Sequence, residues 1–160
     1  MIREVKTEDA VKICDIYNYY VNETTVTFET QPISVAEMRQ RIVDVSSASP
    51  YFVFEEQGEV LGYCYIHPWK AFSAYSHTYE TTIYLSPKSK GRGIGSMLMR
   101  ELIKASRSKG AHVLIACITA DNIESIEFHK RLGFSQSSLF KEVGLKFGKL
   151  LDVIDLQLTL

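Results

Sequence analysis

The chain has 160 residues, and its formal net charge of −1 excludes a general electrostatic affinity for nucleic acid or anionic membranes. It has no apolar run of about 18 residues and no signal-peptide pattern, so we expect neither a membrane span nor a membrane partner. Its three cysteines, Cys14, Cys64 and Cys117, lie in apolar contexts, which indicates reduced core thiols in a cytoplasmic protein.

The N-terminal third contains one strand pattern and two helix patterns. A short strand at 2–5 precedes a helix that begins at Thr7. A second helix is expected from Ser34 to about Val45, because Ser34 and Glu37 have the spacing of a capping box. The apolar residues of the first helix share one face: Ala10, Ile13, Ile16, Tyr17 and Tyr20.

Six further segments have the composition of strands. The first two form a hairpin through Gln57 and Gly58, and the almost entirely apolar segment 111–119 predicts a strand buried on both faces. The element order β-α-α-β-β-β-α-β-α-β-β predicts one mixed α/β domain over residues 1–160. The expected strands lie at 51–55, 60–66, 77–85, 111–119, 134–140 and 151–158.

The most informative stretch combines a strand, a glycine-rich basic turn and an amphipathic helix, expected from about Gly91 to Ser108. A helix N-terminus has unpaired N–H groups and a partial positive charge, and glycines let an anion approach the backbone closely. The stretch therefore predicts a phosphate or pyrophosphate site. Its basic and glycine residues are Lys88, Lys90, Gly91, Arg92, Gly93 and Gly95.

Two common phosphate-binding motifs do not fit this turn. A P-loop needs Lys-Ser/Thr after its last glycine, whereas Gly95 is followed directly by Ser96; a dinucleotide fingerprint needs a different glycine spacing. The run Lys90-Gly91-Arg92-Gly93-Ile94-Gly95 instead resembles the acetyl-CoA loop of the GNAT superfamily of N-acetyltransferases. The alternative is a glycine-rich turn that only caps a core helix.

A second segment resembles the same superfamily. Asn122 begins a helix that ends in Leu132-Gly133-Phe134, as in the second cofactor element of GNAT enzymes. Asn122 is a good N-cap type, and Ser125 falls on the same side of the first turn. The segments 25–32, 67–75, 79–84 and 144–153 resemble the phosphinothricin acetyltransferase branch, whose members acetylate small amino acids and analogues.

The resemblance implies a fold, a cosubstrate and an assembly. The expected fold is α/β of the α+β type, with a mixed, mostly antiparallel sheet of about seven strands flanked by about four helices. Acetyl-CoA is the implied cosubstrate, no metal is expected, and a homodimer is implied, with 150–160 and 69–72 as candidate interface segments. The implied cofactor-binding residues are Ile83, Tyr84, Leu85, Lys90, Gly91, Arg92, Gly93, Ile94, Gly95, Ser96, Asn122 and Ser125.

Acetyl transfer to an amine requires a base, a polarised thioester carbonyl and a stabilised thiolate. Glu80 is the candidate base, because it lies in an otherwise uncharged strand just before the loop and matches the base position of the resembled family. Backbone N–H groups near 83–85 are candidates for the oxyanion. His129 occupies the slot in which many relatives carry a tyrosine acid, although packing is the commoner role of a lone helical histidine.

The acceptor side rests on resemblance alone, which points to Phe28, Glu29 and Tyr75, and to the region of Phe147. The arginines with which relatives bind a substrate carboxylate are replaced here by Phe72 and Ser76. Lys70 and His77 are the remaining candidate carboxylate partners. The expected acceptor is a small-molecule amine; the alternatives are a peptide or protein amine, or a non-catalytic CoA-binding module.

Overall fold

A seven-stranded sheet runs through the computed structural model, which describes all 160 residues. The strand order is β1-β2-β3-β4-β5-β7-β6, and only the pair β4 and β5 is parallel. The predicted mixed, mostly antiparallel sheet is therefore confirmed. The strands are β1 (Ile2–Glu4), β2 (Tyr51–Glu56), β3 (Glu59–Pro68), β4 (Thr78–Leu85), β5 (Val113–Thr119), β6 (Ser135–Lys146) and β7 (Lys149–Thr159).

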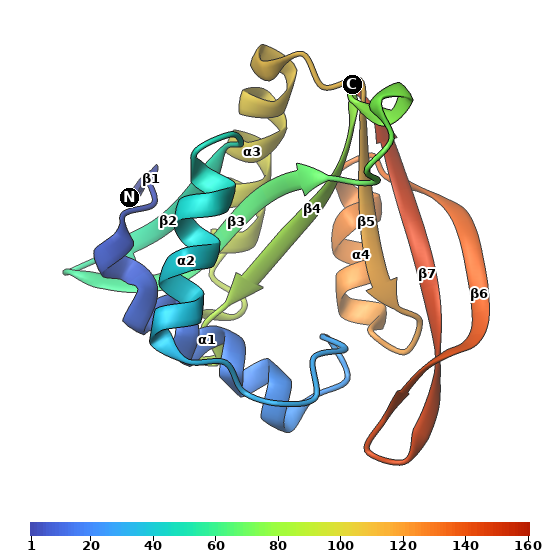
Figure 1. Ribbon diagram of the computed structural model, residues 1–160, viewed down its shortest axis with the longest axis horizontal. Helices are drawn as coiled ribbons and strands as arrows, with labels where there is room; N and C mark the ends of the chain where they lie inside the picture. Colours follow the sequence, from blue (N-terminus) through green and yellow to red (C-terminus); the bar gives the residue numbers. More distant parts are fainter.

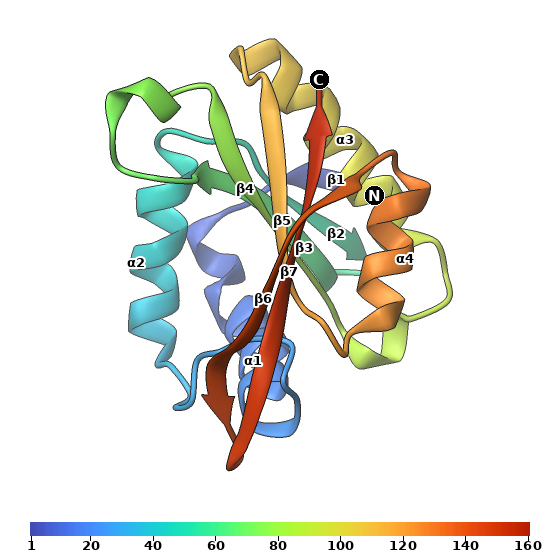
Figure 2. The same ribbon diagram turned by 90° about the vertical axis from the view of Figure 1, so that its right-hand side faces the viewer.

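Two pairs of α-helices cover opposite faces of the sheet (Figures 1 and 2). Tyr63 on β3 packs in the core under α1 and α2, and its neighbour Cys64 packs in the core under α3. None of the helices combines the length and the apolar character needed to span a membrane. The helices are α1 (Ala10–Glu23), α2 (Val35–Ser46), α3 (Ile94–Lys109) and α4 (Ile123–Arg131), with 3-10 turns at Thr7–Asp9, Ser73–Tyr75 and Pro87–Ser89.

The strands β4 and β5 pair for only part of their length. Their ladder ends at Glu80 opposite Ile115, and beyond this point the two strands diverge (Figure 1). On its other side β4 stays paired to β3 as far as Leu85 opposite Gly62. The far half of β4 therefore has one unpaired edge in the middle of the sheet.

Helix α3 begins at Ile94, three residues later than the sequence pattern predicts. Gly91 and Gly93 have φ angles of 75° and 76°, in the left-handed region that a continuing α-helix does not contain. The glycine-rich segment is thus a turn that ends in an N-cap glycine. The predicted starts of the second and fourth helices are confirmed, with Ser34 capping α2 and Asn122 capping α4. The helix predicted from Thr7 starts as a 3-10 turn and becomes the α-helix α1 only at Ala10.

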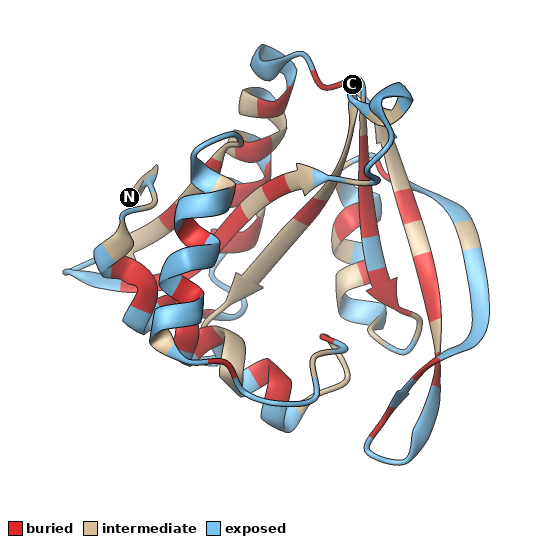
Figure 3. Ribbon diagram, in the orientation of Figure 1, coloured by how far each residue is buried: buried red, intermediate tan, exposed pale blue.

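Strand β5 departs from the predicted burial on both faces. Leu114, Ala116 and Ile118 are buried beneath α3 and α4, but Cys117 is exposed, so the prediction of three core thiols is wrong for this residue (Figure 3). The apolar composition of the strand predicts two covered faces, whereas the second face is covered in part only. Cys14 lies in the buried core, as predicted for a reduced core thiol.

The loop between α1 and α2 is fixed to the C-terminal half of the sheet. The ammonium of Lys146, a buried side chain, donates to the carbonyl of Thr27 at 2.8 Å, and the hydroxyl of Thr119 donates to the carbonyl of Thr25 at 2.7 Å. These two bonds hold Val26 beside the diverging part of β4, where it lines the cavities described below.

The capping box of α2 yields a stability prediction. The Ser34 hydroxyl accepts the Glu37 backbone N–H at 3.1 Å, so Ser34→Ala is expected to lower the free energy of unfolding by about 1 kcal/mol. Ser108→Ala is the matched control, because its exposed hydroxyl only donates to the Lys104 carbonyl within α3. Urea unfolding followed by circular dichroism measures both, and equal effects of the two changes would contradict the capping role.

Candidate active site

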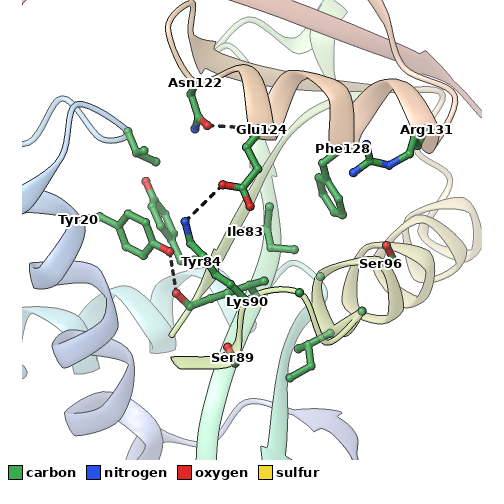
Figure 4. A pocket seen from close by; sticks show the side chains of 17 residues that line it. Tyr20, Ile83, Tyr84, Ser89, Lys90, Ser96, Asn122, Glu124, Phe128 and Arg131 are labelled. Carbon is green, nitrogen blue, oxygen red and sulfur yellow. Dashed lines mark hydrogen bonds and ion pairs between the residues drawn. The ribbon is translucent and has the colours of Figure 1, made fainter. Parts of the chain in front are cut away.

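Two adjoining cavities open where β4 separates from β5. The larger, of about 310 Å³, lies between the glycine-rich turn, β4 and α4 (Figure 4). The smaller, of about 100 Å³, lies between β4, β5 and α4. The residues that line both are Val26, Ile83, Tyr84, Asn122 and Ser125, so the two cavities form one continuous path.

The glycine-rich turn presents a run of unpaired backbone donors. None of the six amides from Gly91 to Ser96 donates a hydrogen bond to a protein acceptor; the first amide to do so is that of Met97, which bonds the Gly93 carbonyl at 3.1 Å. A helix N-terminus with free N–H groups and a partial positive charge is a ready anion site. The turn can therefore hold a pyrophosphate, as its sequence predicts.

Interactions with the neighbouring strands fix the shape of this turn. The buried Ser89 hydroxyl lies 2.9 Å from the Leu61 carbonyl and 2.8 Å from the Ser86 carbonyl. The Arg92 guanidinium contacts both carboxylate oxygens of Glu56 at 2.8 Å. Arg92 is also the one residue of the twelve predicted cofactor contacts that does not line the larger cavity, because this ion pair turns its side chain away.

Helix α4 forms the opposite wall. The Asn122 side-chain oxygen caps the Ser125 amide at 3.2 Å, which leaves the Asn122 NH₂ group and the Ser125 hydroxyl as donors on the cavity side. Figure 4 shows Glu124, Phe128 and Arg131 along the same wall. Glu124 lies 3.4 Å from the Lys90 ammonium across the cavity.

Sequence reasoning missed six residues of the larger cavity. Three of them lie on α4 at positions i, i+4 and i+7, a helical spacing that could have been extended from Asn122. The others come from α1, the loop that follows it and the start of the turn, and only the tertiary structure brings them here. The six are Tyr20, Val26, Ser89, Glu124, Phe128 and Arg131.

The unpaired edge of β4 supplies further donors. Alternate residues of a strand direct their N–H groups to opposite edges, and the Ser86 amide bonds Leu61 on β3. The amides of Ile83 and Leu85 therefore face the gap, while the Tyr84 amide belongs to the β3 ladder. Of the backbone N–H groups predicted as oxyanion donors at 83–85, only those of Ile83 and Leu85 are therefore available. The Leu85 carbonyl accepts a hydrogen bond from the Tyr20 hydroxyl at 2.7 Å.

Glu80 lies at the end of the β4–β5 ladder and lines the smaller cavity. Burial raises the pKa of its carboxyl above the ordinary value near 4.5; the nearby His67 opposes this shift, and Asp155 adds to it. The His67 Nε2 atom is 3.9 Å from Glu80 Oε1. A carboxylate with a raised pKa is a stronger proton acceptor than a fully solvated one.

His129 is a buried side chain with one engaged and one open nitrogen. Its Nδ1 atom lies 2.8 Å from the Ser125 carbonyl, a partner that requires a proton on Nδ1. The Nε2 atom has no partner in the protein. Because every fully buried side-chain nitrogen in this structure has a partner, Nε2 is not fully buried, and we infer that it reaches the smaller cavity, which the His129 ring lines. Burial lowers the pKa of His129, which favours the neutral ring at pH 7.

The residues that the resemblance places at the acceptor side do not line either cavity. The Phe28 ring lies against Gly144 on β6, and Glu29 is paired with Arg41 at 2.8 Å. Tyr75 packs edge-on against Trp69 in the 69–77 loop. The two candidate carboxylate partners are also engaged elsewhere: the Lys70 ammonium lies 4.2 Å from the centre of a Trp69 ring, and His77 bonds the Gly110 carbonyl.

Comparison with known proteins agrees with this geometry. Residues 2–154 match the model of the acetyltransferase (GNAT) domain family. The chain is 37% identical to a phosphinothricin N-acetyltransferase of Streptomyces coelicolor, over 95% of this chain and 91% of the relative. It is 36% identical to an L-methionine sulfoximine/L-methionine sulfone acetyltransferase of Pseudomonas paraeruginosa, over 99% and 94%.

A solved structure shows the same likeness. The crystal structure of a GNAT superfamily phosphinothricin acetyltransferase from Sinorhizobium meliloti, in complex with acetyl-CoA, superposes with a TM-score of 0.96. It is 35% identical, and the match covers all of this chain and 88% of that one. The chain therefore belongs to the GNAT acetyltransferase family and is an acetyl-CoA-dependent N-acetyltransferase.

Proposed function

We propose that this enzyme, a single domain over residues 1–160, acetylates the amine of a small molecule of the amino-acid type. The observation that carries the proposal is the junction of the two cavities, where the path past the anion-binding turn reaches Glu80. The names of the two relatives above, a phosphinothricin N-acetyltransferase and a methionine sulfoximine/methionine sulfone acetyltransferase, support this acceptor class. A cavity of about 100 Å³ suits a small acceptor better than an extended peptide.

Glu80 acts as the general base in this proposal. An amine reaches the site as an ammonium ion, and it becomes a nucleophile only after a proton passes to Glu80, directly or through water. The amine nitrogen then bonds the acetyl carbon as the carbon–sulfur bond breaks. The nitrogen loses its remaining extra proton to become the amide, and the leaving thiolate takes up one proton to become the CoA thiol. The position of Glu80 at the end of the ladder places its carboxylate beside the open edge of β4.

The open edge of β4 binds and polarises the thioester arm. The amides of Ile83 and Leu85 are available for the pantetheine chain and for the carbonyl oxygen on which negative charge develops. The amides of the turn, with Lys90, hold the pyrophosphate. Asn122 and Ser125 provide side-chain donors where the two cavities meet.

His129 is the candidate acid for the leaving thiolate. Its open Nε2 atom faces the smaller cavity, but a ring with its proton on Nδ1 donates from Nε2 only after taking up a second proton. Because burial lowers the His129 pKa, this form is scarce at pH 7. The contribution of His129 is therefore expected to be much smaller than that of Glu80.

We also propose that the enzyme is a homodimer. Of the two candidate segments, 150–160 contributes mainly core residues, whereas 69–72 includes Phe72, which is 78% exposed. The largest group of exposed apolar side chains instead lies along β6 and its turn to β7, which extend beyond the rest of the sheet (Figure 2). Its members are Leu139, Phe140, Val143, Leu145, Phe147 and Leu150.

The role of Glu80 yields a pH prediction. A base must be ionised, so kcat/KM for the acceptor should fall as the pH falls through the Glu80 pKa, which burial places above 4.5. Glu80→Gln should lower kcat by at least about 100-fold at pH values above the Glu80 pKa and abolish that ionisation from the profile. Thiol release from acetyl-CoA measures both effects.

Acetyl-CoA binding is the control for Glu80→Gln, and its Kd should change less than twofold because Glu80 does not line the larger cavity. His129→Gln is the comparison, with an expected loss in kcat of less than tenfold. A Glu80→Gln enzyme with wild-type kcat would contradict the proposed base. Absence of thiol release by the wild type with every amine tested would favour a binding module.

Arg131 yields a prediction about the cosubstrate. Its side chain lines the larger cavity and makes no ion pair, so it is free to meet a phosphate (Figure 4). Arg131→Ala should raise KM for acetyl-CoA about three- to tenfold, and the effect should shrink at high salt. Lys130→Ala is the matched control, since Lys130 pairs with Glu127 at 2.9 Å, and an unchanged KM in Arg131→Ala would contradict the assignment.

A further inference from the structure

A second carboxylate shares the sheet face on which Glu80 lies. Glu80 is registered with Ile115 on β5, and Cys117, two residues further on, points to the same side of that strand. Asp155 on β7 is the cross-strand partner of Cys117, and Ser138 on β6 is the partner of Asp155. Glu80, Cys117 and Asp155 thus lie on one face of three neighbouring strands, and the Cys117–Asp155 pair is two residues further along β5 than the Glu80–Ile115 pair.

Asp155 is held in place but has no cationic partner. The Ser138 hydroxyl donates to Asp155 Oδ2 at 2.9 Å, and the Asp155 amide donates to the same hydroxyl oxygen at 3.2 Å. Asp155 enters no ion pair, unlike Asp152 on the same strand, which pairs with Lys141 at 2.9 Å. The result is an oriented carboxylate without a cationic partner, and its one further side-chain neighbour is the thiol of Cys117.

The charged groups around the smaller cavity give it a negative electrostatic potential. No lysine or arginine lines this cavity, and His67 is the one basic side chain near Glu80, at 3.9 Å. Although Cys117 as a residue is exposed, partial loss of water around its thiol, followed by the carboxylates of Glu80 and Asp155, raises the pKa of that thiol to about 12. Both carboxylates therefore act on the same point of the cavity lining, and Cys117 remains a neutral thiol.

The cavity also contains a polar group that points to an occupant. His129 is 3% exposed, and its Nε2 atom opens into the cavity without a protein partner. A buried ring nitrogen in this state is normally satisfied by a ligand or a water molecule. Glu80 and Cys117 line this cavity, and Asp155 lies directly behind Cys117 as its cross-strand partner.

The nearby basic residues are engaged elsewhere, which leaves a substrate carboxylate without a strong partner. Arg41 is paired with both oxygens of Glu29 at 2.8 and 3.1 Å, and Lys70 lies over Trp69. An acceptor with an extra negative charge would meet two carboxylates here. An acceptor with an extra positive charge would meet a favourable field.

We propose that Asp155 is a specificity-determining residue that selects acceptor amines carrying a second cationic nitrogen, as in a basic amino acid or a diamine. This inference rests on the proposed function. The reacting nitrogen loses its proton near Glu80, while the second nitrogen keeps its proton and pairs with Asp155. Glu80 lies on β4 and Asp155 on β7, and β5 separates these two strands, so their backbones are about 10 Å apart. The two side chains reduce the distance that the acceptor must span between the carboxylates.

Thiol release from acetyl-CoA tests the proposal with pairs of acceptors of similar size. Ornithine and lysine are compared with norleucine and methionine sulfone, which lack a second cation; cadaverine is compared with pentylamine, which separates diamines from amino acids. The wild type is expected to use one of these two sets, amino acids or simple amines, better than the other. Within that set, its kcat/KM should be at least about tenfold higher for the acceptor that carries a second cationic nitrogen. Asp155→Asn should remove this preference by lowering kcat/KM for the cationic member at least about tenfold, in assays at a pH well above the Glu80 pKa, where loss of the Asp155 charge leaves Glu80 ionised.

The control is Asp152→Asn, a change on the same strand that should leave the preference intact. Thermal unfolding monitors folding of both variants, and Asp155→Ser repeats the test if Asp155→Asn is unstable. Equal turnover of cationic and neutral acceptors by the wild type, or a preference that survives loss of the carboxylate, would overturn this inference while leaving the proposed function standing. Absence of thiol release with any amine would overturn both.

Discussion

The early end of the β4–β5 ladder is the constraint on which the site depends. Pairing stops at Glu80 and Ile115, so the rest of β4 carries backbone donors that the sheet does not use. An unsatisfied amide inside a protein costs about 1 to 3 kcal/mol unless water or a ligand meets it. The gap persists because β3 holds the other edge of β4 and because α4 and the loop after α1 build its walls.

Three functions meet at this gap. In our proposal, the six free amides of the glycine-rich turn bind the charged end of the cosubstrate, and the Ile83 and Leu85 amides face its thioester arm. Glu80 stands where the ladder ends, partly removed from water, so that its pKa is raised. The early end of the β4–β5 pairing thus places the unpaired backbone donors of β4 next to Glu80, the candidate base.

The sequence is sufficient for features that are encoded locally. The N-cap Asn122 and the capping box of Ser34 are short-range signals, and the structure confirms both of them. The acceptor side is different, because its residues meet through register between strands. Asp155 adjoins Cys117 only because β7 pairs with β5, and the distance along the chain carries no sign of this. The ion pair between Glu29 and Arg41 joins the loop after α1 to helix α2, a tertiary contact that the sequence pattern does not predict.

The most direct test of the account is to follow the backbone amides during binding. Amide nitrogen–proton correlation spectra would be recorded while CoA is added to the labelled protein. The largest shifts are predicted for Gly91 to Ser96 and for Ile83 and Leu85, with the Tyr84 amide less affected because it bonds within the β3 ladder. Shifts centred on the β6–β7 hairpin, with the turn and the β4 edge unchanged, would contradict the account.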